Sequence, residues 1–192
     1  MRAVLLILFL TFYFTQATSQ LTILEKKEQG AFPLVTPSGA ATILWDSEDD
    51  SLIKKVSLLL QADILMVTGK EPLVMSTLQG GKRIILIGNM NDSKLIRQLV
   101  NSKKINLKEL ENKWEAFQIQ AVQAPFKGVD QALVITGSDR RGTAYGVLEL
   151  SQQIGVSPLH WWANVPAKKQ NALYVKRSVP YVDAPKVKYR GL

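Results

Sequence analysis

The chain has 192 residues, of which 46% are hydrophobic and 21% are charged, and this composition suits one globular domain with short additions. It contains no cysteine and a single histidine, His160, which excludes disulfide cross-links and metal centres built on cysteine or histidine clusters. The net charge of +8 is concentrated in residues 168–190, which hold seven basic residues and one acidic residue. Residues 20–167 carry a net charge of only +1, so the globular part lacks the basic face that nucleic-acid binding requires.

The first residues have the pattern of a secretory signal. Met1 and Arg2 precede an apolar run over residues 3–14, which is long enough for a signal h-region and too short to span a bilayer. Ala17 and Ser19 supply small residues at the usual cleavage spacing. We therefore predict a signal peptide over residues 1–19 and a secreted or periplasmic mature protein that does not span a membrane after cleavage.

The mature chain begins with strand patterns followed by a helix pattern. Two β-rich runs, residues 31–35 and 41–45, flank a turn sequence that contains Pro37 and Gly39, and they predict a hairpin. Residues 52–67 place apolar side chains three and four positions apart, after a group of acids and serines that can cap a helix. We expect a helix over this run that ends at Gly69.

The middle of the chain predicts a buried strand and a second helix. Residues 83–87 form a continuous apolar run, which is typical of a strand covered on both faces. Asp92 or Ser93 can cap the helix that follows over residues 95–100. Residues 101–113 are polar and predict a loop with a helical turn.

The last part of the domain predicts a strand pair and a third helix. Residues 114–122 and 132–136 have strand composition and are expected to pair across a turn over residues 125–130. A helix should follow over residues 141–154 and end at Gly155, which can serve as its C-terminal cap. Together these elements predict an α/β fold in which helices flank a mixed β-sheet.

The glycine-rich turn between the last strand and this helix has the position of a phosphate-binding loop. The turn comprises Gly137, Ser138, Asp139, Arg140 and Gly142, and it lacks both the lysine of a P-loop and the G-x-G-x-x-G pattern. A structural role is favoured, in which Ser138 or Asp139 caps the helix, Arg140 or Arg141 forms an ion pair, and Gly142 and Gly146 allow close packing on the sheet. A doubly wound nucleotide or flavin binder remains the weaker alternative.

A loop with adjacent tryptophans forms the second candidate site. Trp161 and Trp162 follow Pro158 and His160, and flat indole rings serve both as platforms for sugar faces and as anchors for a neighbouring domain. One histidine without cysteine gives no metal site, and no G-x-S-x-G elbow supports a serine hydrolase.

Three segments together resemble one enzyme family. They are residues 135–146 (ITGSDRRGTAYG), 150–158 (LSQQIGVSP) and 161–166 (WWANVP). These segments resemble the N-terminal region of glycoside hydrolase family 115, the secreted xylan α-glucuronidases, and residues 187–191 resemble the lead-in to that family's catalytic barrel. Leu159 and His160 stand where the family more often has aromatic residues, and Asn164 stands where it usually has aspartate, which weakens the case for sugar contact by this loop.

The resemblance implies a domain organisation and a mechanism. Residues 20–167 would be an N-terminal α/β accessory domain, and residues 168–192 a linker with the first, truncated part of the following barrel. Catalysis would be inverting hydrolysis of glucuronoxylan without a cofactor, with the catalytic carboxylic acids on the downstream barrel and none in this chain. The implied partners are that barrel, a glucuronoxylan-type polysaccharide and, for the full-length enzyme, a second copy in a homodimer.

The same resemblance names the residues of the loop as contact candidates. Trp161, Trp162, His160 and Asn164 would contact either the substrate or the neighbouring domain. A stand-alone carbohydrate-binding module that uses the two tryptophans is a further alternative.

Overall fold

The computed structural model describes residues 21–78, 81–176 and 180–187, except the side chain of Trp161. The predicted signal peptide, and residues 188–191 of the expected lead-in to a barrel, lie outside these ranges. Within them, no helix combines the length and the apolar character needed to cross a membrane.

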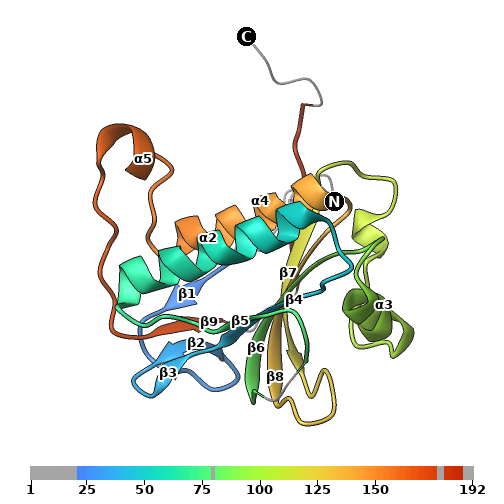
Figure 1. Ribbon diagram of the computed structural model, residues 1–192, viewed down its shortest axis with the longest axis horizontal. Coiled ribbons are helices and arrows are strands. Elements are labelled where there is room, and N and C mark those ends of the chain that lie inside the picture. Colours follow the sequence, from blue (N-terminus) through green and yellow to red (C-terminus); the bar gives the residue numbers. More distant parts are fainter. Residues whose placement is uncertain (1–20, 79–80, 177–179, 188–192) are drawn as a thin grey trace, which may run out of the picture.

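The described residues form two β-sheets (Figure 1). The larger, six-stranded sheet has the order β10-β7-β8-β6-β4-β5, and the smaller, four-stranded sheet has the order β1-β9-β2-β3. The strands of the larger sheet are β4 (Thr42–Trp45), β5 (Val74–Met75), β6 (Arg83–Asn89), β7 (Phe117–Gln123), β8 (Gln131–Gly137) and β10 (Tyr181–Asp183). Those of the smaller sheet are β1 (Ile23–Leu24), β2 (Phe32–Thr36), β3 (Gly39–Ala40) and β9 (Leu173–Val175).

The larger sheet is mixed. Strands β5, β4, β6 and β8 run parallel to one another, whereas β7 is antiparallel to β8 and β10 is antiparallel to β7. The β7–β8 pair is the predicted strand pair, and its register aligns Phe117 with Gly137 and Gln123 with Gln131. The predicted α/β class, a mixed sheet flanked by helices, is confirmed.

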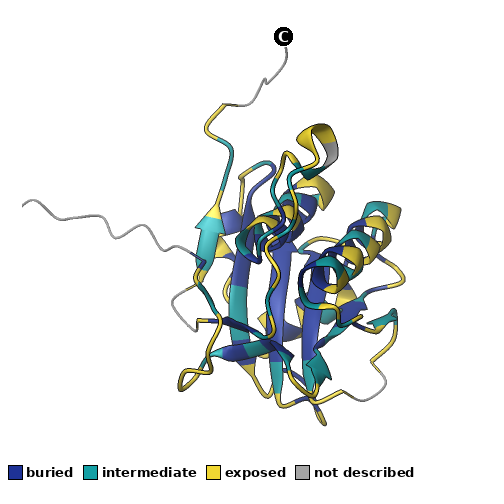
Figure 2. Ribbon diagram, turned by 90° about the vertical axis from the view of Figure 1, so that its left-hand side faces the viewer, coloured by how far each residue is buried: buried dark blue, intermediate teal, exposed yellow. Residues whose placement is uncertain are grey.

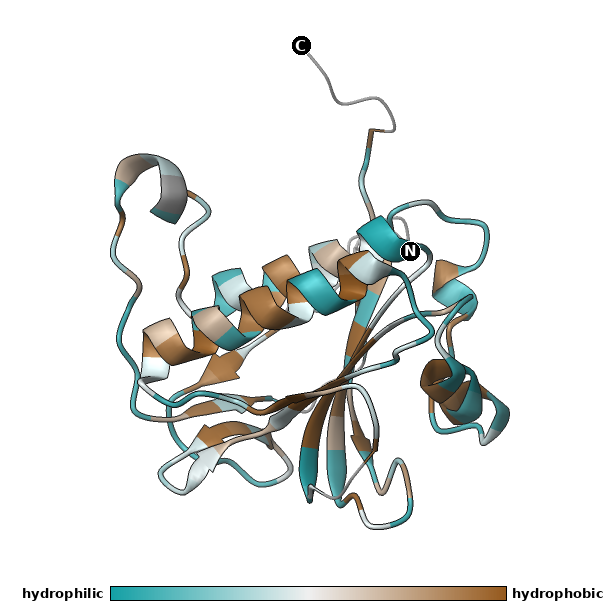
Figure 3. Ribbon diagram, in the orientation of Figure 1, coloured by the Kyte–Doolittle hydropathy of each residue, from teal (hydrophilic) through white to brown (hydrophobic). Residues whose placement is uncertain are grey.

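Helices cover both faces of the larger sheet. Helix α2 (Ser51–Thr68), helix α4 (Arg140–Gln153) and the smaller sheet bury one face, and Ile85 and Ile87 of β6 point into that core. Helix α3 (Lys94–Asn101) and the short 3-10 helix η1 (Lys108–Leu110) cover the other face, where Ile84 and Leu86 lie. Successive side chains of a strand point to opposite faces, so two covered faces explain why β6 is apolar without alternation. Figures 2 and 3 show these buried, apolar strands at the centre of the molecule.

The helices begin and end where their capping residues predict. The Asp50 carboxylate accepts a hydrogen bond from the Leu52 amide at 2.8 Å, and Gly69 ends α2 in the left-handed region with φ 69°. The Ser93 hydroxyl accepts from the Ile96 amide at the start of α3. At the end of α4, Gly155 has φ 113°, and the Val156 amide donates to the Ser151 carbonyl at 3.0 Å, so a Schellman-type turn closes the helix.

The predicted hairpin between residues 31–35 and 41–45 is wrong, because these two strands do not pair with each other. Strand β2 turns back onto β3, with Thr36 opposite Gly39, and β4 then enters the larger sheet between β5 and β6. Ile43 and Leu44 explain this placement, because both are buried although they point to opposite faces. A strand with two buried faces is stable in the interior of a covered sheet and not in an exposed hairpin.

The interpretation of residues 168–192 as a linker is also corrected in part. Strand β9 pairs with β1 and β2 in the smaller sheet, and β10 forms an edge of the larger sheet. Leu173, Tyr174 and Val175 are buried, so this run contributes to the core beyond residue 167. The many lysines around these short strands concealed them in the sequence.

Candidate functional site

The carboxyl ends of β4, β6 and β8 meet at one edge of the larger sheet, where open α/β proteins commonly bind ligands. Here the edge is occupied by side chains of the chain itself. The Asp46 carboxylate accepts from the amides of Lys94 and Leu95 at the start of α3, and Asp49 accepts from the Asn89 amide at 2.7 Å. Burial is the main cause that raises the pKa of Asp49 above its usual value. The carboxylates at this edge therefore bind backbone amides of the chain itself.

The turn between β8 and α4 belongs to the same network. Asp139 accepts from the Gly142 amide at 2.8 Å through one carboxylate oxygen and from the Glu115 amide at 2.7 Å through the other. Its carbonyl accepts from the Thr143 amide at 3.0 Å. The Asp139 carboxylate thus occupies the position that a phosphate would need at this helix N-terminus, and it already accepts from the Gly142 amide. This arrangement argues against the nucleotide-binding alternative.

The glycines of the turn are in close contact with neighbouring backbone. A Cβ atom at Gly137 would lie 2.1 Å from the Thr143 nitrogen, and one at Gly142 would lie 2.3 Å from the Ala116 carbonyl oxygen. A Cβ atom at Gly146, further along α4, would lie 2.9 Å from a side-chain carbon of Ile135 and 3.1 Å from one of Phe117. The glycines therefore let α4 approach the sheet.

The remaining predicted turn residues stabilise these contacts. The Ser138 amide donates to the Ala116 carbonyl, and the Ser138 hydroxyl accepts from the Ala116 amide at 3.1 Å. Arg140 forms an ion pair with Asp50 at 3.0 Å. Arg141 forms one with Glu115 at 2.9 Å, and the acidic partner is nearly buried.

The tryptophan loop projects away from the two sheets. Helix α5 (His160–Ala163) lies at the tip of an extended loop, apart from α2 and α4 (Figure 1). Trp162 is 88% exposed, and Asn164 ends the short helix in the left-handed region with φ 51°. His160 lies 2.8 Å from the Val165 carbonyl through Nδ1, and that nitrogen must donate because a carbonyl only accepts. The side chain of Trp161 lies outside the described structure.

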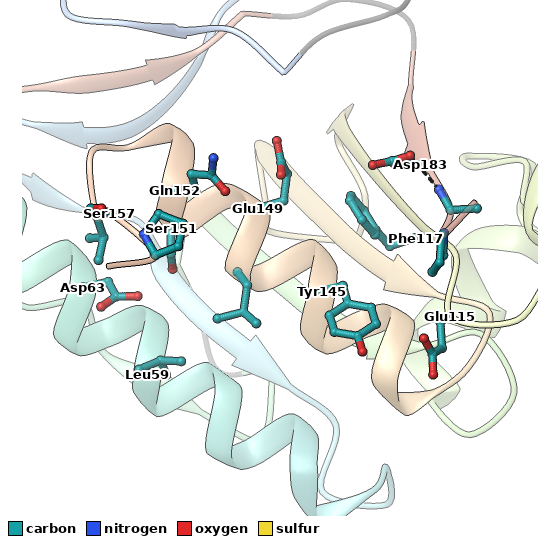
Figure 4. A pocket seen from close by; sticks show the side chains of 15 residues that line it. Leu59, Asp63, Glu115, Phe117, Tyr145, Glu149, Ser151, Gln152, Ser157 and Asp183 are labelled. Carbon is teal, nitrogen blue, oxygen red and sulfur yellow. Dashed lines mark hydrogen bonds between the residues drawn. The ribbon is translucent and has the colours of Figure 1, made fainter. Parts of the chain in front are cut away.

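A groove of about 460 Å³ lies at the base of this loop. It runs between α2 and α4, and the segment that leads to α5 and the residues around the end of β10 also line it. Figure 4 shows Asp63 and Ser151 at one end, Tyr145 and Glu149 in the middle, and Glu115 and Asp183 at the other end. This groove was not among the sites predicted from the sequence. Its one signal was Asp63, an acid among the apolar positions of the α2 pattern.

A buried carboxylate lines the groove, and a shielded phenol, that of Tyr181, lies near two of its other carboxylates. Asp63 is 3% exposed, and burial raises its pKa, while interactions with the Ser151 hydroxyl and the His160 ring act against the rise. Burial and the nearby carboxylates of Glu149 and Asp183 raise the pKa of Tyr181, on β10, to about 12.

Asp63, Ser151 and His160 are not arranged as a catalytic relay. In a Ser-His-Asp triad the aspartate accepts the Nδ1 proton of the histidine. The His160 Nδ1 instead donates to the Val165 carbonyl. No group of three or more His, Cys, Asp or Glu side chains in the described ranges could hold a metal ion.

No protein-family model matches the chain, and no curated protein matches it in sequence. Among solved structures, it is similar to a family GH115 4-O-methyl-alpha-glucuronidase with specificity for decorated arabinogalactans, with 28% identity and a TM-score of 0.66. That match covers 82% of this chain and 19% of the enzyme, so the chain spans about a fifth of its length.

Two weaker matches are also glycoside hydrolases. A GH20 beta-N-acetylhexosaminidase from Streptomyces coelicolor A3(2) is 14% identical with a TM-score of 0.47 over 88% of this chain and 26% of that one. The protein CpGH84D is 15% identical with a TM-score of 0.46 over 81% of this chain and 22% of that one. These two carry no argument at such values, and the GH115 match alone supports the conclusion that this is a glycoside hydrolase-related α/β domain.

Proposed function

We propose that the chain is the N-terminal, non-catalytic domain of an exported glycoside hydrolase that removes 4-O-methylglucuronic acid from a polysaccharide. The observation that carries this proposal is the GH115 match, which covers most of this chain and a small part of a much longer enzyme. The resemblance of residues 135–166 to family 115 points in the same direction. Glucuronoxylan is the substrate that the resemblance suggests, and the matched enzyme acts on decorated arabinogalactans, so both polysaccharides belong in the tests.

The role of such a domain is to support a catalytic barrel. The self-capped sheet edge described above offers no open ligand position there, whereas the α5 loop presents Trp162 to the outside. A large exposed aromatic ring on a projecting loop is typical of an anchor for another domain. The inverting mechanism requires two carboxyl groups on opposite sides of the glycosidic bond, and we assign them to the barrel.

The size and location of the natural polypeptide test this proposal. An antibody raised against the purified chain should detect a secreted polypeptide several times larger than 21.4 kDa in the culture fluid or periplasm of the source organism. That polypeptide should release 4-O-methylglucuronic acid from glucuronoxylan or arabinogalactan. A single cytoplasmic species of 21 kDa would contradict the proposal.

The exposure of Trp162 also favours a second candidate function, a carbohydrate-binding module. An indole ring can stack on a sugar face, and Trp162 is 88% exposed. Titration of the chain with xylo-oligosaccharides should then show binding that Trp162→Ala weakens by roughly tenfold or more. Leu159→Ala is the matched control, because Leu159 is 57% exposed on the same loop. Absence of binding by the unmodified chain would leave the domain-anchor role.

A further inference from the structure

The groove between α2 and α4 has properties that the proposed function does not use. It is apolar at Leu59, Leu148 and Val156, and Leu148 is 44% exposed. A groove with apolar walls and an exposed leucine can bury surface of a partner.

The charges of this groove have one sign. Asp63, Glu115, Glu149 and Asp183 line it, and none of the described residues that line it is a lysine or an arginine. Glu115 is paired with Arg141, but within the described residues Asp63, Glu149 and Asp183 form no ion pair with a lysine or arginine. A uronic acid would be repelled here, whereas a cationic side chain would be attracted.

One end of the groove holds a buried hydroxyl group, that of Ser151. Ser151 is 4% exposed, and its hydroxyl oxygen has no hydrogen-bond partner of acceptable geometry in the described structure. Its interaction with Asp63 acts to lower the pKa of that carboxyl group, against the effect of burial. Figure 4 shows both side chains together at this end of the groove. A buried carboxylate beside a buried unsatisfied hydroxyl is a receptor for a hydrogen-bond donor that carries positive charge.

After β10, the chain runs along this groove. Ala184 and Pro185 line it, and Lys186 and Val187 are exposed just beyond. A partner segment tethered near this exit would meet the groove at a high effective concentration.

We propose that the α2–α4 groove is a docking site for a basic segment of polypeptide, in which Asp63 and Ser151 receive one lysine or arginine side chain. The proposal deepens the proposed function, because it names the face on which another part of the enzyme would dock. The apolar walls bury the segment, and the three carboxylates without a cationic partner select its charge.

Titration of the full chain with a hexa-arginine peptide, followed by the amide resonances of the protein, tests this site. The largest shifts are expected at residues that line the groove. Asp63→Asn should weaken the association by roughly tenfold. Ser151→Ala should weaken it less, because it removes a neutral acceptor. Asp130→Asn, the same change at an exposed position remote from the groove, should leave it unaltered.

The outcomes separate the proposal from its alternatives. Asp63→Asn should keep its fold in thermal melting, because it removes a carboxylate whose burial opposes ionisation. Equal weakening by Asp63→Asn and Asp130→Asn would show non-specific attraction and overturn the proposal. Shifts in the groove with xylohexaose but not with hexa-arginine would make it a saccharide site instead. The proposed function is tested separately, by the size and location of the natural polypeptide. A failure of the docking proposal is therefore distinguishable from a failure of the proposed function.

Discussion

The stability of the fold depends on single residues where β8 turns into α4, and Gly142 is an example. In most helices, replacement of glycine by alanine adds about 0.5–1 kcal/mol of stability. At Gly142 the new Cβ would lie 2.3 Å from the Ala116 carbonyl oxygen, which is part of the backbone and cannot move aside easily. We expect Gly142→Ala to lower the free energy of unfolding by about 1–3 kcal/mol, measured by urea denaturation.

The exposed side of the same helix supplies the control for Gly142. Leu148→Ala removes a half-exposed side chain and should change the free energy of unfolding by at most about 0.5 kcal/mol. A Gly142→Ala protein as stable as the unmodified chain would mean that α4 does not approach the sheet as described.

The raised pKa of Tyr181 predicts that the stability of the fold depends on pH. Its pKa in the folded chain is about 12, above the ordinary value of 10.0, because burial and two carboxylates oppose the phenolate. The folded state therefore holds the proton more tightly than the unfolded state, and this contribution is complete below pH 10 and lost as the pH rises towards 12.

Absorbance of the phenolate gives the measurement for Tyr181. The difference between the titration curves of the unmodified chain and Tyr181→Phe should have a midpoint near pH 12. A difference curve centred near pH 10 would show that the ring is exposed to solvent and that β10 is not docked.

At the scale of elements, β10 decides where the domain ends. It pairs with β7 over residues 181–183, and the Tyr181 ring meets Phe117 edge-on with centroids 5.8 Å apart. Val182→Pro should break this pairing, because proline lacks the amide proton and strains the strand. Hydrogen exchange measured by mass spectrometry should then become faster in peptides that cover residues 117–123 and 180–185.

Lys186→Pro is the control for β10. Lys186 is exposed and lies after the strand, so its replacement should leave exchange in both peptides unchanged. If residues 181–183 already exchange as fast as an unfolded peptide in the unmodified chain, they belong to a linker after all.

The helices were predictable from the sequence because their signals are local. Asp50 and Gly69 delimit α2, Ser93 starts α3, and Asp139 caps α4 through contacts within a few residues. Strands β1, β3, β5, β9 and β10 were not predicted. Each has two or three residues, which is too short for a period of two to be recognised.

At the scale of the whole molecule, we expect the chain by itself to be inactive. Inverting hydrolysis needs an acid and a base about 6.5–9.5 Å apart on either side of an accessible glycosidic bond. The match covers only 19% of the GH115 enzyme, and we place the catalytic acid and base in the part that this chain does not cover.

Chromatography of the released sugars checks this expectation. The purified chain should release no 4-O-methylglucuronic acid from glucuronoxylan or from decorated arabinogalactan beyond the amount seen with heat-denatured protein. Release that Asp63→Asn or Glu149→Gln abolishes would place a catalytic pair in this domain and refute the non-catalytic role.

The amino-acid sequence by itself determined the α/β class, the ends of the three longer helices, the apolar strand β6 and the structural turn before α4. These features depend on capping groups, glycine conformations and apolar runs that interact over short stretches of chain. Only the tertiary structure decided that β4 leaves its hairpin for the larger sheet, that β9 and β10 complete the two sheets, and that Asp63, Ser151 and Asp183 line one groove. Those arrangements depend on which distant segments bury each other's surfaces, and that choice is made by the packing of the whole core.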